Sequence, residues 1–272
     1  MPLCIPINIH LISKIFIMTK EEAKDKLLKQ NKWPMVADLF CGKKLYMCDK
    51  QLVWPDEREL KMLISHNNRQ KNEDTKYILE IPPEPWSANI LEAKVVILSL
   101  NPGYIDYLNR DLANMFSEKY AKQITEDKHS ILYMKPQRES LASRILGDCY
   151  WYKALKRIGV DAYEEQNWEK VLDNVAVIQC CAYASKSKSL PKETLPSQEY
   201  TKKVIMYLAE YTKAQFLLMR AVSEWEKFLG EDFVKSLGDR WIVSAHYRNQ
   251  TISAKNIGQN QYEKVIEALK SK

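Results

Sequence analysis

Glycine is scarce in this chain, and the glycine-rich loops that hold phosphates are missing from it. The 272 residues include only seven glycines, and these form neither a GxGxxG nor a GxxxxGK[ST] pattern. Such loops bring backbone N–H groups against the phosphates of nucleotides, and glycine permits the close approach. We therefore expect an activity that uses no nucleotide cofactor.

Paired cysteines at metal-binding or redox spacing are also missing. The chain has six cysteines, and no two of them form the CxxC pattern typical of zinc and redox sites. We expect packed, reduced thiols in a cytoplasmic protein, with no metal and no other cofactor.

The chain has no hydrophobic run long enough to cross a bilayer. The apolar segment within residues 1–17 is interrupted by His10 and Lys14, and it lacks a basic leader and a small-residue cleavage site. Thr19 and Glu22 have the spacing of a capping box, which predicts a helix starting directly after Met18. We expect residues 1–17 to be an addition before the natural start or a short extra strand, and we expect no membrane partner.

Charge of either sign is not strongly in excess. The formal net charge of +6 supports an anionic partner without identifying it. An apolar content of 46% with 28% charged residues is typical of a folded, soluble chain.

Four short apolar runs have the length and the β-branched content of buried parallel strands. They are KVVILSL (94–100), NVAVIQC (174–180), AQFLLMR (214–220) and RWIVSA (240–245). Predicted helices separate or follow them at 110–124, 141–159, 197–212, 221–238 and 260–271. This alternation predicts a three-layer α/β/α sandwich around a four-stranded parallel sheet, over residues 81–272. We interpret residues 1–80 as a mainly helical N-terminal extension packed on this core.

Polar segments follow three of the predicted strands, and ligands of such folds bind beyond the carboxyl ends of the strands. SLNPGY places Asn101 and Tyr104 after the first run, although an ordinary turn would look the same. The lysine- and serine-rich loop 178–192 suits phosphate or sugar contacts, with Tyr183 as a stacking face, unless it is only a solvated loop. His246 leaves the last strand ahead of a polar loop, a position that favours function.

These segments together resemble the uracil-DNA glycosylase superfamily. PEPWSANILEAKVVILSLNPGY (83–104) is similar to its first motif, in which an Asn or Asp beside a proline positions the hydrolytic water. SAHYRNQTISAKNIG (244–258) is similar to its second, in which a histidine faces the base and the next loop enters the minor groove. VAVIQCCAYASKS (175–187) corresponds to the strand and loop that read the base and the backbone. The spacing of Cys41 and Cys48 does not fit the iron–sulfur cluster of some members.

The resemblance implies a monofunctional DNA glycosylase that flips a modified base out of DNA and leaves an abasic site. Asn101 and His246 are then the expected catalytic residues. Tyr104, Gln179 and Asn249 are the expected base-binding residues, and Ser185, Lys186, Lys188 and Arg248 are the expected contacts to the DNA backbone.

The substrate remains open between uracil and a hypermodified phage cytosine such as glucosylated hydroxymethylcytosine, in repair or in antiphage defence. The aromatic residues Trp33, Tyr46, Trp54 and Trp86 could enclose such a modification. We expect a monomer that binds DNA. The alternatives are a catalytically silent nucleic-acid-binding or sensor module of the same fold, and a hydrolase of free nucleosides or nucleotides.

Overall fold

The computed structural model describes residues 18–33, 35–36, 52–81, 83–86, 90–104, 150–245 and 251–271. The predicted helix at 110–124 and the first part of the one at 141–159 lie outside these ranges. The same holds for Tyr46, Cys41, Cys48 and the residues 246–250.

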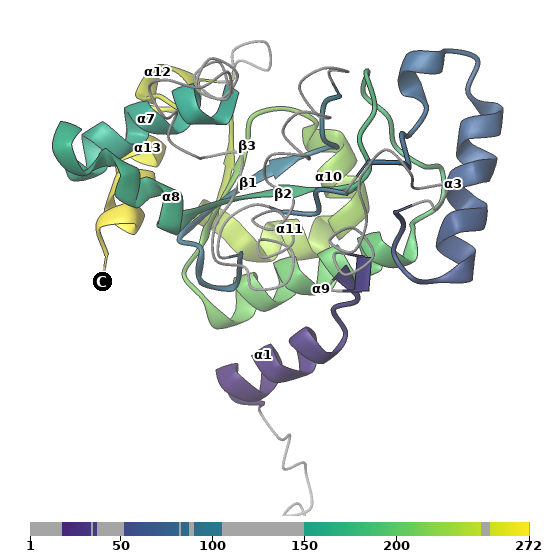
Figure 1. Cartoon of the computed structure of the whole chain (residues 1–272). Coiled ribbons are helices and arrows are strands. Elements are labelled where there is room, and N and C mark those ends of the chain that lie inside the picture. The colour runs from purple at the N-terminus through teal and green to yellow at the C-terminus, as the bar shows by residue number, and fades with distance from the viewer. Residues whose placement is uncertain are drawn as a thin grey trace, which may run out of the picture.

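A four-stranded parallel sheet forms the centre of the molecule (Figure 1). Its strands are β1 (Val95–Ser99), β2 (Val175–Gln179), β3 (Gln215–Leu218) and β4 (Trp241–Val243), in the spatial order β2-β1-β3-β4. Each lies within one of the four predicted runs. The side chains of β2 and most of those of β1 and β3 are buried, as expected for a sheet covered on both faces.

Helices connect and cover the strands. The α-helices are α1 (Lys20–Lys29), α3 (Glu57–Arg69), α7 (Tyr150–Tyr163), α8 (Val171–Asn174), α9 (Pro196–Tyr211), α10 (Val222–Leu229), α11 (Glu231–Leu237), α12 (Ala254–Ile257) and α13 (Gln259–Lys270). Short 3₁₀ turns cover Glu73–Thr75, Ile90–Glu92, Glu165–Lys170 and Gly238–Arg240. The single helix predicted at 221–238 is two helices, because Gly230 between them has a φ of +97°, which ends a helix and favours glycine.

The helices form a layer on each face of the sheet. The chain runs from β1 to β2 in one direction and from β2 to β3 in the other, so right-handed crossovers place α7 and α9 on opposite faces. α13 packs against α7 and β1, whereas α1 and α3 pack against α9. The α/β/α sandwich and the helical N-terminal region are therefore confirmed.

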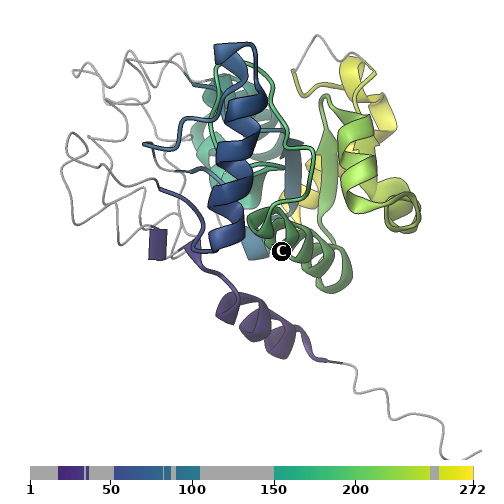
Figure 2. The ribbon, with the colours of Figure 1, turned by 90° about the vertical axis from the view of Figure 1, so that its right-hand side faces the viewer.

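The N-terminal elaboration shares the hydrophobic core of the α/β unit. The predicted capping box of α1 is present, with Thr19 and Glu22 bonded reciprocally. Trp33 and Leu63 belong to the same buried cluster as the strands. Helix α3 lies on the right-hand side of Figure 1 and faces the viewer, in blue, in Figure 2. No helix within the described ranges is long and apolar enough to cross a membrane.

The strand order creates a topological switch point. β1 and β3 are neighbours, yet the connection after β1 leads to β2 and the connection after β3 leads to β4 on the opposite side. Connections that diverge in this way leave a crevice between the carboxyl ends of the two strands, where ligands of open α/β sheets bind. Asn101 lies two residues after β1 and so at this switch point.

Candidate active site at the carboxyl ends of the strands

The segments after β1 and β2 run side by side beyond the sheet. Cys180 N donates to Ser99 O at 2.9 Å and Cys181 N to Leu100 O at 2.7 Å. Gly103 and Ser185 then form a parallel β-bridge. This pairing brings Asn101 and the loop after β2, two of the predicted site segments, together.

The amide of Asn101 is held by this loop in one orientation. Its Nδ2 donates to Ser185 Oγ at 2.8 Å and to Pro102 O at 3.2 Å, and its Oδ1 accepts from Ser189 N at 3.4 Å. A backbone N–H can only donate, so the contact with Ser189 identifies the carbonyl oxygen. Asn101 is half-buried, and among the described residues its Oδ1 accepts one long hydrogen bond. This oxygen therefore has a lone pair with which it can orient a water molecule.

Ser185 has a different place from the one expected. Its side chain is only 1% exposed. Its Oγ accepts from Asn101 and donates to Ser187 O at 2.5 Å. The hydroxyl is thus occupied inside the loop, where it positions Asn101 and does not face outward to a phosphate.

The lysines of the loop after β2 are exposed. Lys186 and Lys188 both lie on the surface, as a contact with the DNA backbone requires. Lys188 forms an ion pair with Glu224 of α10, and its hydrogen bond lowers the pKa of that carboxyl. The pair joins the loop after β2 to the helix after β3, so the loop extends over the end of β1, which lies between them.

Tyr104 and Gln179 are both buried, in different environments. Tyr104 is 7% exposed and packs with Ile81 and Ala184, so it does not stand over an opening. Gln179 ends β2 and is 5% exposed, and its Oε1 is buried without a hydrogen-bond partner in the part of the chain that the structure describes. An unpaired buried carbonyl oxygen is unfavourable by about 1–3 kcal/mol. Gln179 is therefore a candidate for contact with a ligand N–H group.

The expectation that Tyr183 offers a stacking face is wrong. The ring is 1% exposed. Its hydroxyl donates to Glu59 Oε1 at 2.6 Å and accepts from Trp54 N at 3.1 Å. Tyr183 is a core residue that ties the loop after β2 to the N-terminal region.

The expectation that the N-terminal aromatics enclose a base modification is wrong for the three that are described. Trp33, Trp54 and Trp86 are buried. The rings of Trp33 and Trp54 pack edge to face, with their centroids 4.8 Å apart. They fill the core and leave no aromatic face for a sugar.

A buried carboxylate at the start of α9 was not foreseen from the sequence. Glu59 of α3 is fully buried, and it accepts hydrogen bonds from Ser197 N at 2.7 Å and from the Ser197 hydroxyl. Burial raises the pKa of Glu59, and the hydrogen bonds from Ser197 and Tyr183 oppose this. A carboxylate at a helix N-terminus is stabilised by the N–H groups there.

A second carboxyl beside the loop was also missed. Glu84 N donates to Ala182 O at 2.8 Å. Burial raises the pKa of Glu84 to about 7, although part of the residue is exposed. A carboxyl that titrates near neutrality is a candidate functional group. Its signal in the sequence is a glutamate between two prolines just before β1.

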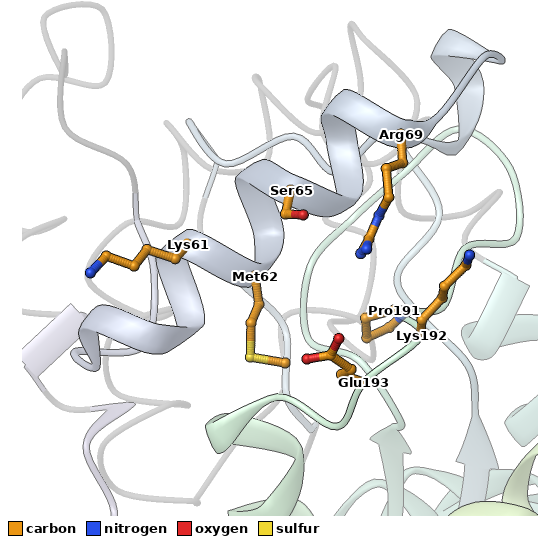
Figure 3. A pocket seen from close by; sticks show the side chains of 7 residues that line it. All are labelled: Lys61, Met62, Ser65, Arg69, Pro191, Lys192 and Glu193. Carbon is orange, nitrogen blue, oxygen red and sulfur yellow. The ribbon is translucent and has the colours of Figure 1, made fainter.

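A shallow groove of about 160 Å³ lies between α3 and the end of the same loop (Figure 3). Arg69 and Lys192 lie at one end of it, and the carboxylate of Glu193 lies nearer to Met62. These charged side chains are exposed. The groove combines both signs of charge and so does not indicate a single ligand.

The ends of β3 and β4 lie on the other side of the switch point. Ala221, which precedes α10, has φ 61° and ψ 36°, a left-handed conformation that is unusual for alanine and clusters at functional sites. Ser244 N donates to Leu218 O at 2.9 Å, and Ala245 N donates to Asn256 O at 2.8 Å. The chain therefore leaves β4 beside the end of β3. The predicted residues His246, Arg248 and Asn249 follow directly but lie outside the described residues.

The described cysteines and acidic residues do not indicate a metal centre. Within the described ranges, no group of three histidine, cysteine, aspartate or glutamate side chains could hold a metal ion. Cys180 and Cys181 are buried free thiols, and burial raises the pKa of Cys181 to about 12. A thiol with such a pKa is a poor nucleophile at neutral pH.

Comparisons of the chain with family models, with curated proteins and with solved structures gave no match. The function is therefore argued from the geometry of the site.

Proposed function

We propose that the protein is a monofunctional DNA glycosylase that hydrolyses the N-glycosidic bond of a modified base and leaves an abasic site. One observation carries the proposal. At the switch point of the sheet, Asn101 is half-buried and fixed through Nδ2, with a lone pair of Oδ1 available, beside a loop that carries the exposed Lys186 and Lys188.

The chemistry requires little basicity from the protein. Breaking the bond builds positive charge on the sugar and negative charge on the departing base, as in other glycoside hydrolysis. Once the bond is largely broken, an amide carbonyl suffices to orient the attacking water, and this is the role of Asn101. His246 is the proposed donor to the leaving base, which it stabilises as an oxyanion hole would.

The base must leave the helix to reach this site, at a cost of a few kcal/mol in lost stacking and pairing. The unpaired Oε1 of Gln179 suits an N–H group on the edge of the flipped base. Asn249 is the proposed second reader of the base, and the buried Tyr104 sets the floor of the pocket.

Lys186, Lys188 and Arg248 are the proposed contacts to phosphates. Lys188 exchanges its ion pair with Glu224 for a phosphate when DNA binds. Each phosphate contact releases counterions, so binding weakens as salt rises, with a slope set by the number of contacts.

The test is an abasic-site assay. Purified protein is incubated with matched duplexes that carry cytosine, uracil or glucosylated hydroxymethylcytosine, then treated with alkali, and the strands are sized. Alkali-dependent breaks at one modified base would establish the glycosylase and name its substrate. Intact strands together with tight, salt-sensitive binding would favour the silent binding module. Weak binding with the salt slope of a single contact, and release of base from free nucleotide, would favour a nucleotide hydrolase.

A further inference from the structure

One buried histidine has no part in the mechanism above, yet it contacts the loop that holds Asn101. His66 lies on the inner side of α3 and is 2% exposed. Its ring stacks on Tyr77, with the centroids 4.7 Å apart and the planes at 27°. Its Nε2 lies 2.9 Å from Ser189 Oγ.

The direction of that hydrogen bond follows from the neighbours. The Ser189 hydroxyl donates its proton to Thr75 O at 2.6 Å, so the proton shared with His66 must come from the imidazole. Burial lowers the pKa of His66; a hydrogen bond to the Thr75 backbone partly opposes this shift, and the charge of Arg69 lowers the pKa slightly further. The imidazole is therefore neutral at pH 7, with its proton on Nε2.

Ser189 connects His66 to Asn101 through hydrogen bonds. Its backbone N donates to Asn101 Oδ1 at 3.4 Å, while its side chain is fixed by His66 and Thr75. A second tether holds the same loop, because Ser187 N donates to Asp74 O at 2.7 Å. Helix α3 and the turn after it thus form a support for the loop after β2, from outside the sheet.

We propose that His66 is a positioning residue for Asn101, which it orients through Ser189. The inference rests on the proposed function, since it assigns to the N-terminal region a role in fixing the water-orienting amide. Without His66, Ser189 loses a donor and the loop can shift. A shift of about 1 Å at a catalytic group lowers turnover by about 100-fold.

The test compares His66→Ala with Leu63→Ala, a buried neighbour on the same helix. Leu63→Ala removes core packing from α3 without touching Ser189, so it controls for lost stability. Excision is measured under single-turnover conditions, on the duplex identified by the abasic-site assay, at a temperature where thermal melting shows each variant folded. We expect His66→Ala to slow excision by about 10- to 100-fold with DNA affinity unchanged within about twofold. We expect Leu63→Ala to leave the rate within about twofold of the wild type.

Two further variants keep the proposal testable if His66→Ala fails to fold. Ser189→Ala removes only the hydroxyl that His66 holds, and it should slow excision in the same range. His66→Gln retains an N–H donor and should recover most of the rate. Equal slowing by Leu63→Ala and by His66→Ala, or an unchanged rate in Ser189→Ala, would overturn the proposal.

A readout that needs no enzymatic activity separates this inference from the proposed function. The side-chain amide signals of Asn101 are assigned by NMR from their loss in Asn101→Ala. They should shift and exchange faster with solvent in Ser189→Ala and His66→Ala, but not in Leu63→Ala. Unchanged signals would contradict the positioning role even if the base is excised, whereas shifted signals without any excision would contradict only the proposed glycosylase activity.

Discussion

The two ends of the parallel sheet differ in how their polar groups are used. At the carboxyl end, Asn101 is hydrogen-bonded to both Ser185 and Ser189, and the two serines are buried. At the amino end lies a wider hollow of about 850 Å³, lined by exposed charges of both signs such as Glu210 and Lys213. The charged side chains Glu210 and Lys213 are exposed, whereas Ser185 and Ser189 at the carboxyl end are buried. Buried polar groups that converge, more than the size of a cavity, identify the candidate site.

The energetic cost of burying polar side chains explains why this difference is informative. Burying a polar side chain is unfavourable unless its hydrogen bonds are satisfied, so a fold retains such groups where they have a structural or functional role. Exposed surface charges carry no such cost, and most surface ion pairs contribute at most about 1 kcal/mol. The variants below test whether function follows the buried network.

The largest effect is expected at Asn101. Asn101→Ala removes the carbonyl proposed to orient water, and we expect excision to fall by about 100- to 1000-fold, with DNA affinity changed by only a few fold. Lys213→Ala, at the amino end, is the matched control and should leave both quantities unchanged. Single-turnover excision and equilibrium binding on the same duplex measure the effect. Equal losses of excision in Asn101→Ala and Lys213→Ala would contradict a special role for the carboxyl end.

Glu84 should make the stability of the protein depend on pH. Its pKa rises from 4.5 to about 7 on folding, so the folded state disfavours the ionised carboxylate. The stabilisation is present in full below pH 4.5 and is lost as the pH rises through about 7, by about 3 kcal/mol in total. Urea unfolding at pH 5 and pH 8 should show this loss in the wild type but not in Glu84→Gln. The exposed Glu80→Gln should behave like the wild type, and an identical pH response in all three proteins would refute the assignment.

A smaller effect is expected at Ser185. Ser185→Ala removes the acceptor of Asn101 Nδ2, which frees the amide to rotate and leaves a donor unpaired at about 1–3 kcal/mol. We expect excision to slow by about 10-fold, with DNA affinity retained. Ser187→Ala, on the exposed part of the same loop, contributes only its backbone to the network and should excise at the wild-type rate. A fall in DNA affinity without a fall in rate would instead return Ser185 to the backbone-contact role first expected.

The smallest effects are expected for the exposed lysines. Lys186→Ala should weaken binding similarly for every sequence and reduce the salt slope by about one. Glu224→Gln releases Lys188 from its ion pair, and should strengthen binding slightly at low salt. Fluorescence anisotropy over a salt series measures both, and a sequence-dependent loss in Lys186→Ala would argue against a phosphate contact.

The strands could be predicted from the sequence because their signal is local. Runs such as VVIL and VAVI are apolar throughout and rich in β-branched residues, as is typical of strands buried on both faces. Their order along the chain placed Asn101 at a strand end, since polar residues after such runs emerge at the edge of the sheet. The break at Gly230 was missed because a glycine inside a helical pattern is often tolerated.

The supports of the site could not be predicted, because they depend on contacts between distant residues. Tyr183 and Glu59 lie 124 residues apart in the sequence, and His66 and Ser189 lie 123 apart. An aromatic beside lysines suggests a stacking face until the tertiary structure buries it, as it does Tyr183. His246, Arg248 and Asn249 stay predictions.

The most direct test of which end of the sheet is functional is hydrogen–deuterium exchange with and without DNA. A duplex with a stable abasic-site analogue is used at saturating concentration. The account predicts slower exchange in peptides that cover 99–104 and 180–189, and unchanged exchange in 210–215. Protection of 210–215, or no protection at 99–104 despite bound DNA, would contradict it.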